Sequence, residues 1–192
     1  ITPRVIYQKI STDGFNRQEV FNLYANPFTT TRPAVTFGER EQHLLLQEAF
    51  EDETMIADAT IKIGLGGVDL TSVRSYTDRD ILVSRDASAL TGSVSVDLGF
   101  PTAGVLLPSN LRDTTKVKSF TQEVRLSSNG DGPLQWVLGG FYSNTDRNYA
   151  QRLPTPGYDA FTDATFAAGL SATLANGFPL NSPYNADINY DI

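Results

Sequence analysis

The chain has 192 residues, with 15 Lys and Arg against 22 Asp and Glu, which gives a formal net charge of −7. This balance argues against a nucleic-acid partner, because phosphate binding needs a local surplus of basic residues. The chain has no cysteine, which excludes disulfides, thiolate metal sites and a cysteine nucleophile. Its one histidine, His43, excludes metal sites that need two histidines and has no evident serine partner. We therefore expect no metal, no cofactor and no enzymatic activity.

Runs rich in Val, Ile, Thr, Tyr and Phe, bounded by Gly, Asn, Asp and Pro, indicate an all-β protein. The predicted strands are residues 2–10, 54–65, 68–84, 116–128 and 134–148. A helical turn is expected around Glu41–Phe50. The cleanest alternation is in 54–65, where one phase is apolar and the other polar. The apolar phase consists of Met55, Ala57, Ala59, Ile61, Ile63 and Leu65.

The connections between these strands are of two kinds. Tight turns are predicted at Gly64–Gly67 and Asn129–Pro133, whereas 11–53, 86–115 and 149–192 form long polar connections. Compact soluble domains rarely carry several such loops, but outer-membrane barrels alternate short turns with long loops. Strands of about 10 residues also fit the length of a tilted strand that crosses a membrane. The pattern predicts an antiparallel up-and-down meander, part of a large transmembrane β-barrel with short periplasmic turns and long extracellular loops.

Side-chain phase predicts which residues face the lumen of such a barrel and which face lipid. Glu123 and Arg125 share one face of their strand and are expected to point inward. Trp136 and Tyr142 share the phase expected to face outward, where aromatic residues form girdles at membrane interfaces. Neither phase of 68–77 is apolar, and we expect Arg74 to point inward, because an arginine facing lipid at midplane costs about 2–4 kcal/mol.

Three segments resemble the barrel region of TonB-dependent outer-membrane receptors. They are ITPRVIYQKISTDGF (1–15), VDLTSVRSYTDRD (68–80) and SFTQEVRLSSNGDGPLQWVLGGFYS (119–143). The resemblance implies a plugged barrel of about 22 strands that imports a scarce ligand with energy from TonB. No plug, TonB box or closing strand is recognisable, so we expect residues 1–192 to be a partial barrel domain. The implied partners are outer-membrane lipid, the TonB complex through the plug, and a small molecule such as a siderophore, vitamin, oligosaccharide or aromatic compound.

Aromatic residues in the long connections are the candidate ligand contacts, because exposed aromatics usually meet a partner or pack together. They are Phe15, Tyr24, Phe28, Tyr149, Tyr158 and Phe161. Two acidic groups are interpreted as solvated surface rather than metal sites. They are the run Glu48, Glu51, Asp52 and Glu53, and the alternating Asp187, Asn189 and Asp191.

A second hypothesis is a soluble β-sandwich that binds carbohydrate or another ligand. Such a module requires two packed sheets with apolar inner faces and ordered long loops. A hydrolase is the least favoured reading, because the sequence offers one histidine and no recognisable nucleophile motif.

Overall fold

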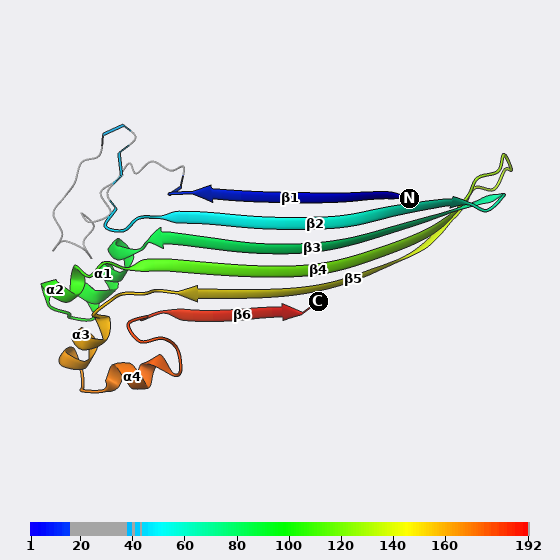
Figure 1. The fold of residues 1–192 in the computed structure, drawn as a ribbon. Coiled ribbons are helices and arrows are strands. Elements are labelled where there is room, and N and C mark those ends of the chain that lie inside the picture. The colour runs from blue at the N-terminus through cyan, green and yellow to red at the C-terminus, as the bar shows by residue number, and fades with distance from the viewer. Residues whose placement is uncertain (16–37, 40, 43, 192) are drawn as a thin grey trace.

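Six strands form a single antiparallel sheet in the computed structural model, which describes residues 1–15, 38–39, 41–42 and 44–191. Each strand pairs with its neighbours in sequence, in the order β1-β2-β3-β4-β5-β6, and the sheet is not closed (Figure 1). This confirms the predicted antiparallel meander, while closure into a barrel stays a prediction. The strands are β1 (Thr2–Thr12), β2 (Ala49–Gly64), β3 (Val68–Asp86), β4 (Asn110–Ser128), β5 (Val137–Arg152) and β6 (Asn185–Asp191).

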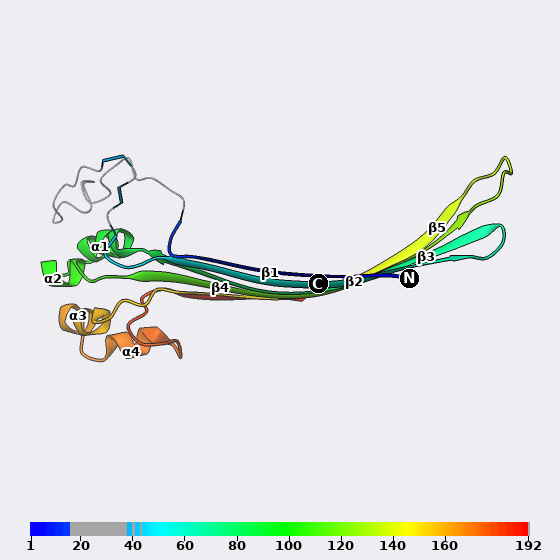
Figure 2. The ribbon, with the colours of Figure 1, turned by 45° about the horizontal axis from the view of Figure 1, so that its top comes forward.

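The two kinds of connection lie at opposite ends of the sheet. The tight turns after β2 and β4 lie together at one end, whereas the longer connections gather at the other (Figure 1). Figure 2 shows the sheet nearly edge-on, with the short-turn ends bent away from the line of the strands. Gly66 supplies the positive φ of 82° that the first turn requires, which is costly for other residues. The predicted arrangement of turns and long connections is thus confirmed for the described residues.

The sequence did not predict the elements within the long connections, and one local prediction was wrong. The described residues of these connections contain four helices, and the last connection also contains β6. No helix forms over the described residues of Glu41–Phe50, where bends lead into β2 at Ala49. The helices are α1 (Ser88–Asp97), α2 (Thr102–Val105), α3 (Tyr158–Thr165) and α4 (Leu170–Ala175).

Nearer the tight turns, the strand register places most apolar side chains of five strands on one side of the sheet, here called the apolar face. The other side carries fewer of them, namely Ile6, Ile56, Val73, Val137 and Phe141. Residues directly opposite each other on paired strands share a face. One row of the apolar face runs across β2, β3, β4 and β5. It consists of Ile63, Leu70, Leu126 and Leu138, each directly opposite the next. The same face carries Val5 and Tyr7 of β1, Met55, Ala57, Ala59 and Ile61 of β2, Tyr76 of β3, Phe120 and Val124 of β4, and Tyr142 of β5.

The apolar face changes character toward the long connections. Beyond Tyr7 and Tyr76 it carries rows of charged side chains, here called the charged belt. Lys9 and Glu53 form an ion pair at 3.3 Å in one of these rows. The belt consists of Lys9, Glu53, Asp78, Asp80, Lys116, Lys118 and Asp146. The apolar residues therefore form a band of limited height rather than covering the whole strand length.

The opposite side of the sheet, here called the polar face, carries charges inside the height of the band. Arg4 pairs with Asp58 at 2.7 Å, and Arg125 pairs with Glu123 at 2.8 Å. The prediction that Glu123 and Arg125 share a face opposite to the apolar phase of 54–65 is confirmed by the register. Because side chains alternate along a strand, one sequence has produced two surfaces suited to different media.

Arg74 is the exception, and the prediction that it faces away from the apolar side is wrong. It lies opposite Ala59 on one side and Gln122 on the other, which places it on the apolar face. Its Nε donates to Gln122 Oε1 at 3.0 Å, and its guanidinium carbon lies 5.6 Å from the centre of the Phe120 ring. Gln122 also donates to Ser72 Oγ at 3.0 Å. Neighbouring side chains thus satisfy part of the hydrogen-bonding capacity of this arginine.

Candidate functional site

The helices at the long-connection end pack around a small aromatic core. Phe100 lies between α1 and α2, and its ring centre is 5.1 Å from that of Tyr158 and 6.4 Å from that of Phe161, both in α3. Val105 completes the buried cluster. Burial raises the pKa of the Tyr158 phenol, which therefore stays neutral at physiological pH. This core joins two connections that are separate in the sequence, the one after β3 and the one after β5.

Buried hydroxyl groups join the same two connections beneath this core. Ser88 Oγ accepts the backbone N–H of Ser109 at 3.0 Å. Ser109 Oγ lies 2.9 Å from Thr155 Oγ1, and Thr155 Oγ1 donates to the carbonyl of Leu153. Ser88, Ser109 and Thr155 are fully buried. Because buried polar groups are costly unless paired, this hydrogen-bonded group fixes the helices relative to the sheet end.

A cavity of about 890 Å³ opens between α1, α3, α4 and the segment that leads into β6. Side chains at its wall include Leu90 and Val94 from α1, Phe166 after α3, and Leu174 from α4. Tyr158 contributes to both the cavity wall and the aromatic core. The cavity has the size of small-molecule sites, which are usually apolar with a few polar groups. We take it as the candidate functional site.

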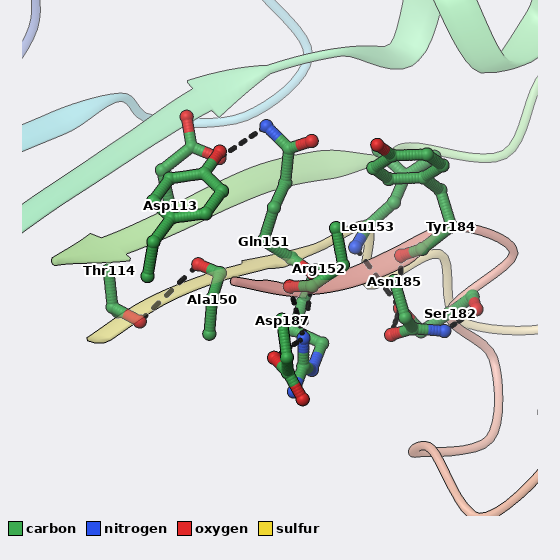
Figure 3. A network of polar contacts seen from close by, with 12 residues as sticks. Asp113, Thr114, Ala150, Gln151, Arg152, Leu153, Ser182, Tyr184, Asn185 and Asp187 are labelled. Atoms are coloured by element: carbon green, nitrogen blue, oxygen red, sulfur yellow. Dashed lines mark hydrogen bonds and ion pairs between the residues drawn. The ribbon is translucent and has the colours of Figure 1, made fainter. Parts of the chain in front are cut away.

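A polar network lies next to the cavity where β4, β5 and β6 meet (Figure 3). Asp113 accepts hydrogen bonds from Tyr149 Oη at 3.1 Å and from Gln151 Nε2, and it pairs with Arg85 at 2.7 Å. On the other face of β5, Arg152 pairs with Asp187 of β6 at 2.7 Å. Asp113 of β4 thus holds side chains from β3 and β5 in fixed positions.

Two short polar links hold the last connection in shape. Asn181 Oδ1 accepts the backbone N–H groups of Gly157 and Asp159, while Asp159 Oδ2 accepts the N–H of Asn181 at 2.8 Å. Asp163 accepts the backbone N–H of Ser171 at 2.8 Å, which lowers the pKa of its carboxyl. Both links cross from α3 to later residues, and so the cavity wall has an ordered frame.

The predicted ligand contacts are only partly brought together. Tyr158 and Phe161 lie together on α3, around Phe100. Tyr149 lies on the polar face and donates to Asp113, and Phe15 packs edge-on against Phe50, with 6.4 Å between ring centres. Tyr24 and Phe28 lie outside the described residues, as does His43. Whether any of these residues contacts a ligand stays a prediction.

The acidic run at the start of β2 has structural partners. The buried Glu48 accepts the backbone N–H of Asp86 at 3.1 Å, and Arg79 binds both carboxylate oxygens of Asp52. Glu53 accepts from Tyr7 and Lys9. Among the described residues, no group of three or more acidic or histidine side chains is placed to hold a metal ion.

Sequence reasoning did not select the α1 residues of the cavity wall. Leu90, Val94 and Leu98 are spaced by four, the spacing of one face of a helix. This signal was present, but Ser, Thr and Gly between these residues are poor helix formers and obscured it. The α4 residue Leu174 carries a similar signal with Leu170, again four residues apart.

Comparison of the chain with protein-family models, with curated proteins and with solved structures found no match. Within the part of the chain that the structure describes, no helix has the length and apolar character needed to span a bilayer.

Proposed function

We propose that the chain is part of the barrel wall of a TonB-dependent receptor in the bacterial outer membrane, where it contributes to ligand recognition and TonB-energised uptake. The strands supply the wall, and the helices and long connections supply a ligand-facing surface. No covalent chemistry is involved. The observation that carries this proposal is the band of apolar side chains on one face of the sheet, backed by ion pairs on the other.

The dimensions of the apolar band support this proposal. From Met55 to Ile63 the band extends for eight residues of β2, or about 27 Å along the strand. A strand tilt of about 40° reduces this to about 20 Å, close to the roughly 25 Å apolar band of transmembrane barrels. Tyr7 and Tyr76 lie near its upper edge, next to the charged belt, as in an aromatic girdle.

The polar face supports the same proposal from the other side. The Arg4–Asp58 and Arg125–Glu123 pairs lie at the height of the apolar band, where a lipid-facing charge would be costly. A water-filled or plugged lumen accepts such pairs readily. The charged side chains of this face therefore fit a lumen.

The alternative of a soluble β-sandwich has less support. A sandwich needs a second sheet on the apolar face, and the described residues form one sheet only. Leu138 and Tyr142 on that face are 68% and 58% exposed. Such a surface needs lipid or a second sheet to cover it, because large exposed apolar patches are unusual in soluble proteins.

The experiment is to locate the full-length protein and then to probe both faces of β5. An antibody against residues 149–165 should detect it in the outer-membrane fraction, and detection in the soluble fraction would overturn the proposal. The segment contributes no cysteine. Spin labels at Leu138→Cys and Ser143→Cys should then report opposite faces, with the first relaxed by lipid-soluble oxygen and the second by a water-soluble nickel complex. Equal accessibility at both positions would contradict a lipid-facing wall.

A further inference from the structure

We propose that the cavity between α1, α3 and α4 binds a neutral, largely apolar molecule of drug size. Its role in uptake rests on the proposed receptor function, whereas binding itself depends only on the cavity. Two observations carry the inference: the charge of the wall and the way in which the wall is held.

The wall of the cavity is unsuited to a charged ligand. Of the described residues that line it, none is Lys or Arg, and Asp159 is the one carboxylate. Asp159 already accepts the backbone N–H of Asn181 at 2.8 Å. An anionic ligand, such as a phosphate ester, sulfate ester or iron complex of negative charge, would be desolvated there without a countercharge. The aliphatic and aromatic side chains instead favour burial of apolar surface.

The cavity is formed by fixed elements, which favours binding of a defined shape. Its walls come from two connections that are tied together by Ser109 and Thr155 and by the packing of Phe100 on Tyr158. The Asp159–Asn181 hydrogen bonds hold the third side. The volume of about 890 Å³ lies in the range of sites that enclose drug-sized molecules. A site held in this way loses little conformational freedom when it binds a ligand.

The test uses tritiated testosterone, a neutral polycyclic probe with a hydroxyl and a carbonyl oxygen, and the full-length protein in lipid nanodiscs. Native and variant proteins are compared at equal lipid content, so that partition of the probe into lipid cancels. Leu174→Trp fills the cavity from α4 and should weaken binding at least tenfold. Leu180→Trp is the matched control: Leu180 is similarly exposed, at 61% against 66% for Leu174, and does not line the cavity. It should leave binding unchanged.

The remaining outcomes separate the two proposals. Testosterone sulfate, with one added charge, should bind at least tenfold more weakly than testosterone. Equal binding of the two, or no effect of Leu174→Trp, would overturn the cavity proposal even if the protein resides in the outer membrane. Loss of binding in Leu174→Trp but not in Leu180→Trp would support the cavity proposal. This result would hold even if fractionation placed the protein outside the outer membrane and so overturned the receptor proposal.

Discussion

The two faces of the sheet are built from alternate residues of the same strands, yet they differ in where their ion pairs lie and in how continuous their apolar rows are. The apolar face holds rows such as Ile63, Leu70 and Leu126, whereas the polar face at similar height holds the Arg125–Glu123 pair. Neighbouring residues in one strand therefore face different surroundings. Two adjacent positions in one strand can therefore serve as a variant and its matched control, because the same substitution at each position tests one face against the other.

The largest expected effect comes from placing a charge on the apolar face. Ile61→Lys should destabilise the folded protein in a bilayer by about 2–4 kcal/mol, because the ammonium group would replace an apolar side chain inside the band. Thr60→Lys is the control in the same strand, since Thr60 pairs with Thr2 and Val73 on the polar face. It should change stability by less than about 0.5 kcal/mol. Urea unfolding of the full-length protein in lipid vesicles measures both, and equal losses would remove the distinction between the faces.

The next effect tests packing at two adjacent glycines of β5. A Cβ atom on Gly139 would lie 2.7 Å from the backbone carbonyl oxygen of Val124, whereas one on Gly140 would meet nothing within 4 Å. Gly139→Ala should therefore cost about 1–3 kcal/mol, because the strands must separate. Gly140→Ala should be neutral or should stabilise by about 0.5 kcal/mol through lower entropy of the unfolded chain. Thermal unfolding of both variants checks this, and a stable Gly139→Ala would show that β4 and β5 approach less closely than described.

A smaller effect is expected from the ion pairs of β2. Asp52 is 8% exposed and is bound by Arg79 through two hydrogen bonds, one of 3.0 Å from Nε. Asp52→Asn leaves the partly exposed Arg79 guanidinium, whose side chain is 44% exposed, without its countercharge and should cost about 1–2 kcal/mol, less than for a fully buried pair. Glu53→Gln, one residue further on, removes an exposed partner of Lys9 and should change stability much less. If urea unfolding showed the same loss of stability in both variants, burial of Asp52 would contribute nothing to the strength of its ion pair.

The sequence predicted the parts of the fold that depend on local pattern. The alternation around Ile61 and the glycine turn after β2 placed the first hairpin correctly, since both signals are short-range. It did not reveal β6, because the residues of this strand on the apolar-face side, Asn185, Asp187, Asn189 and Asp191, are all polar and give no apolar phase. A strand stabilised mainly by pairing with β5 has no periodic signature of its own.

The candidate site was predicted in part for a similar reason. Aromatic composition selected Tyr158 and Phe161 as residues with a partner, and the structure places both against Phe100. It could not indicate that Phe100 is that partner, because the contact spans more than fifty residues of sequence. The cavity depends on such long-range contacts, because its wall combines residues from the connection after β3 with residues from the connection after β5.

The smallest effect concerns Arg74, the residue that departs from the division between faces. Arg74→Leu should raise stability in a bilayer, by no more than about 1 kcal/mol. The lipid cost of the arginine is relieved, but its hydrogen bond to Gln122 and its contact with the Phe120 ring are lost. Arg125→Leu on the polar face should instead lower stability slightly, because Glu123 loses its partner. Opposite signs of the stability change, measured in the same vesicles, would show that the face on which an arginine lies decides whether it stabilises the protein. A marked loss in Arg74→Leu would mean that Arg74 binds a group other than lipid, and the apolar face would then be a protein-covered surface at that height.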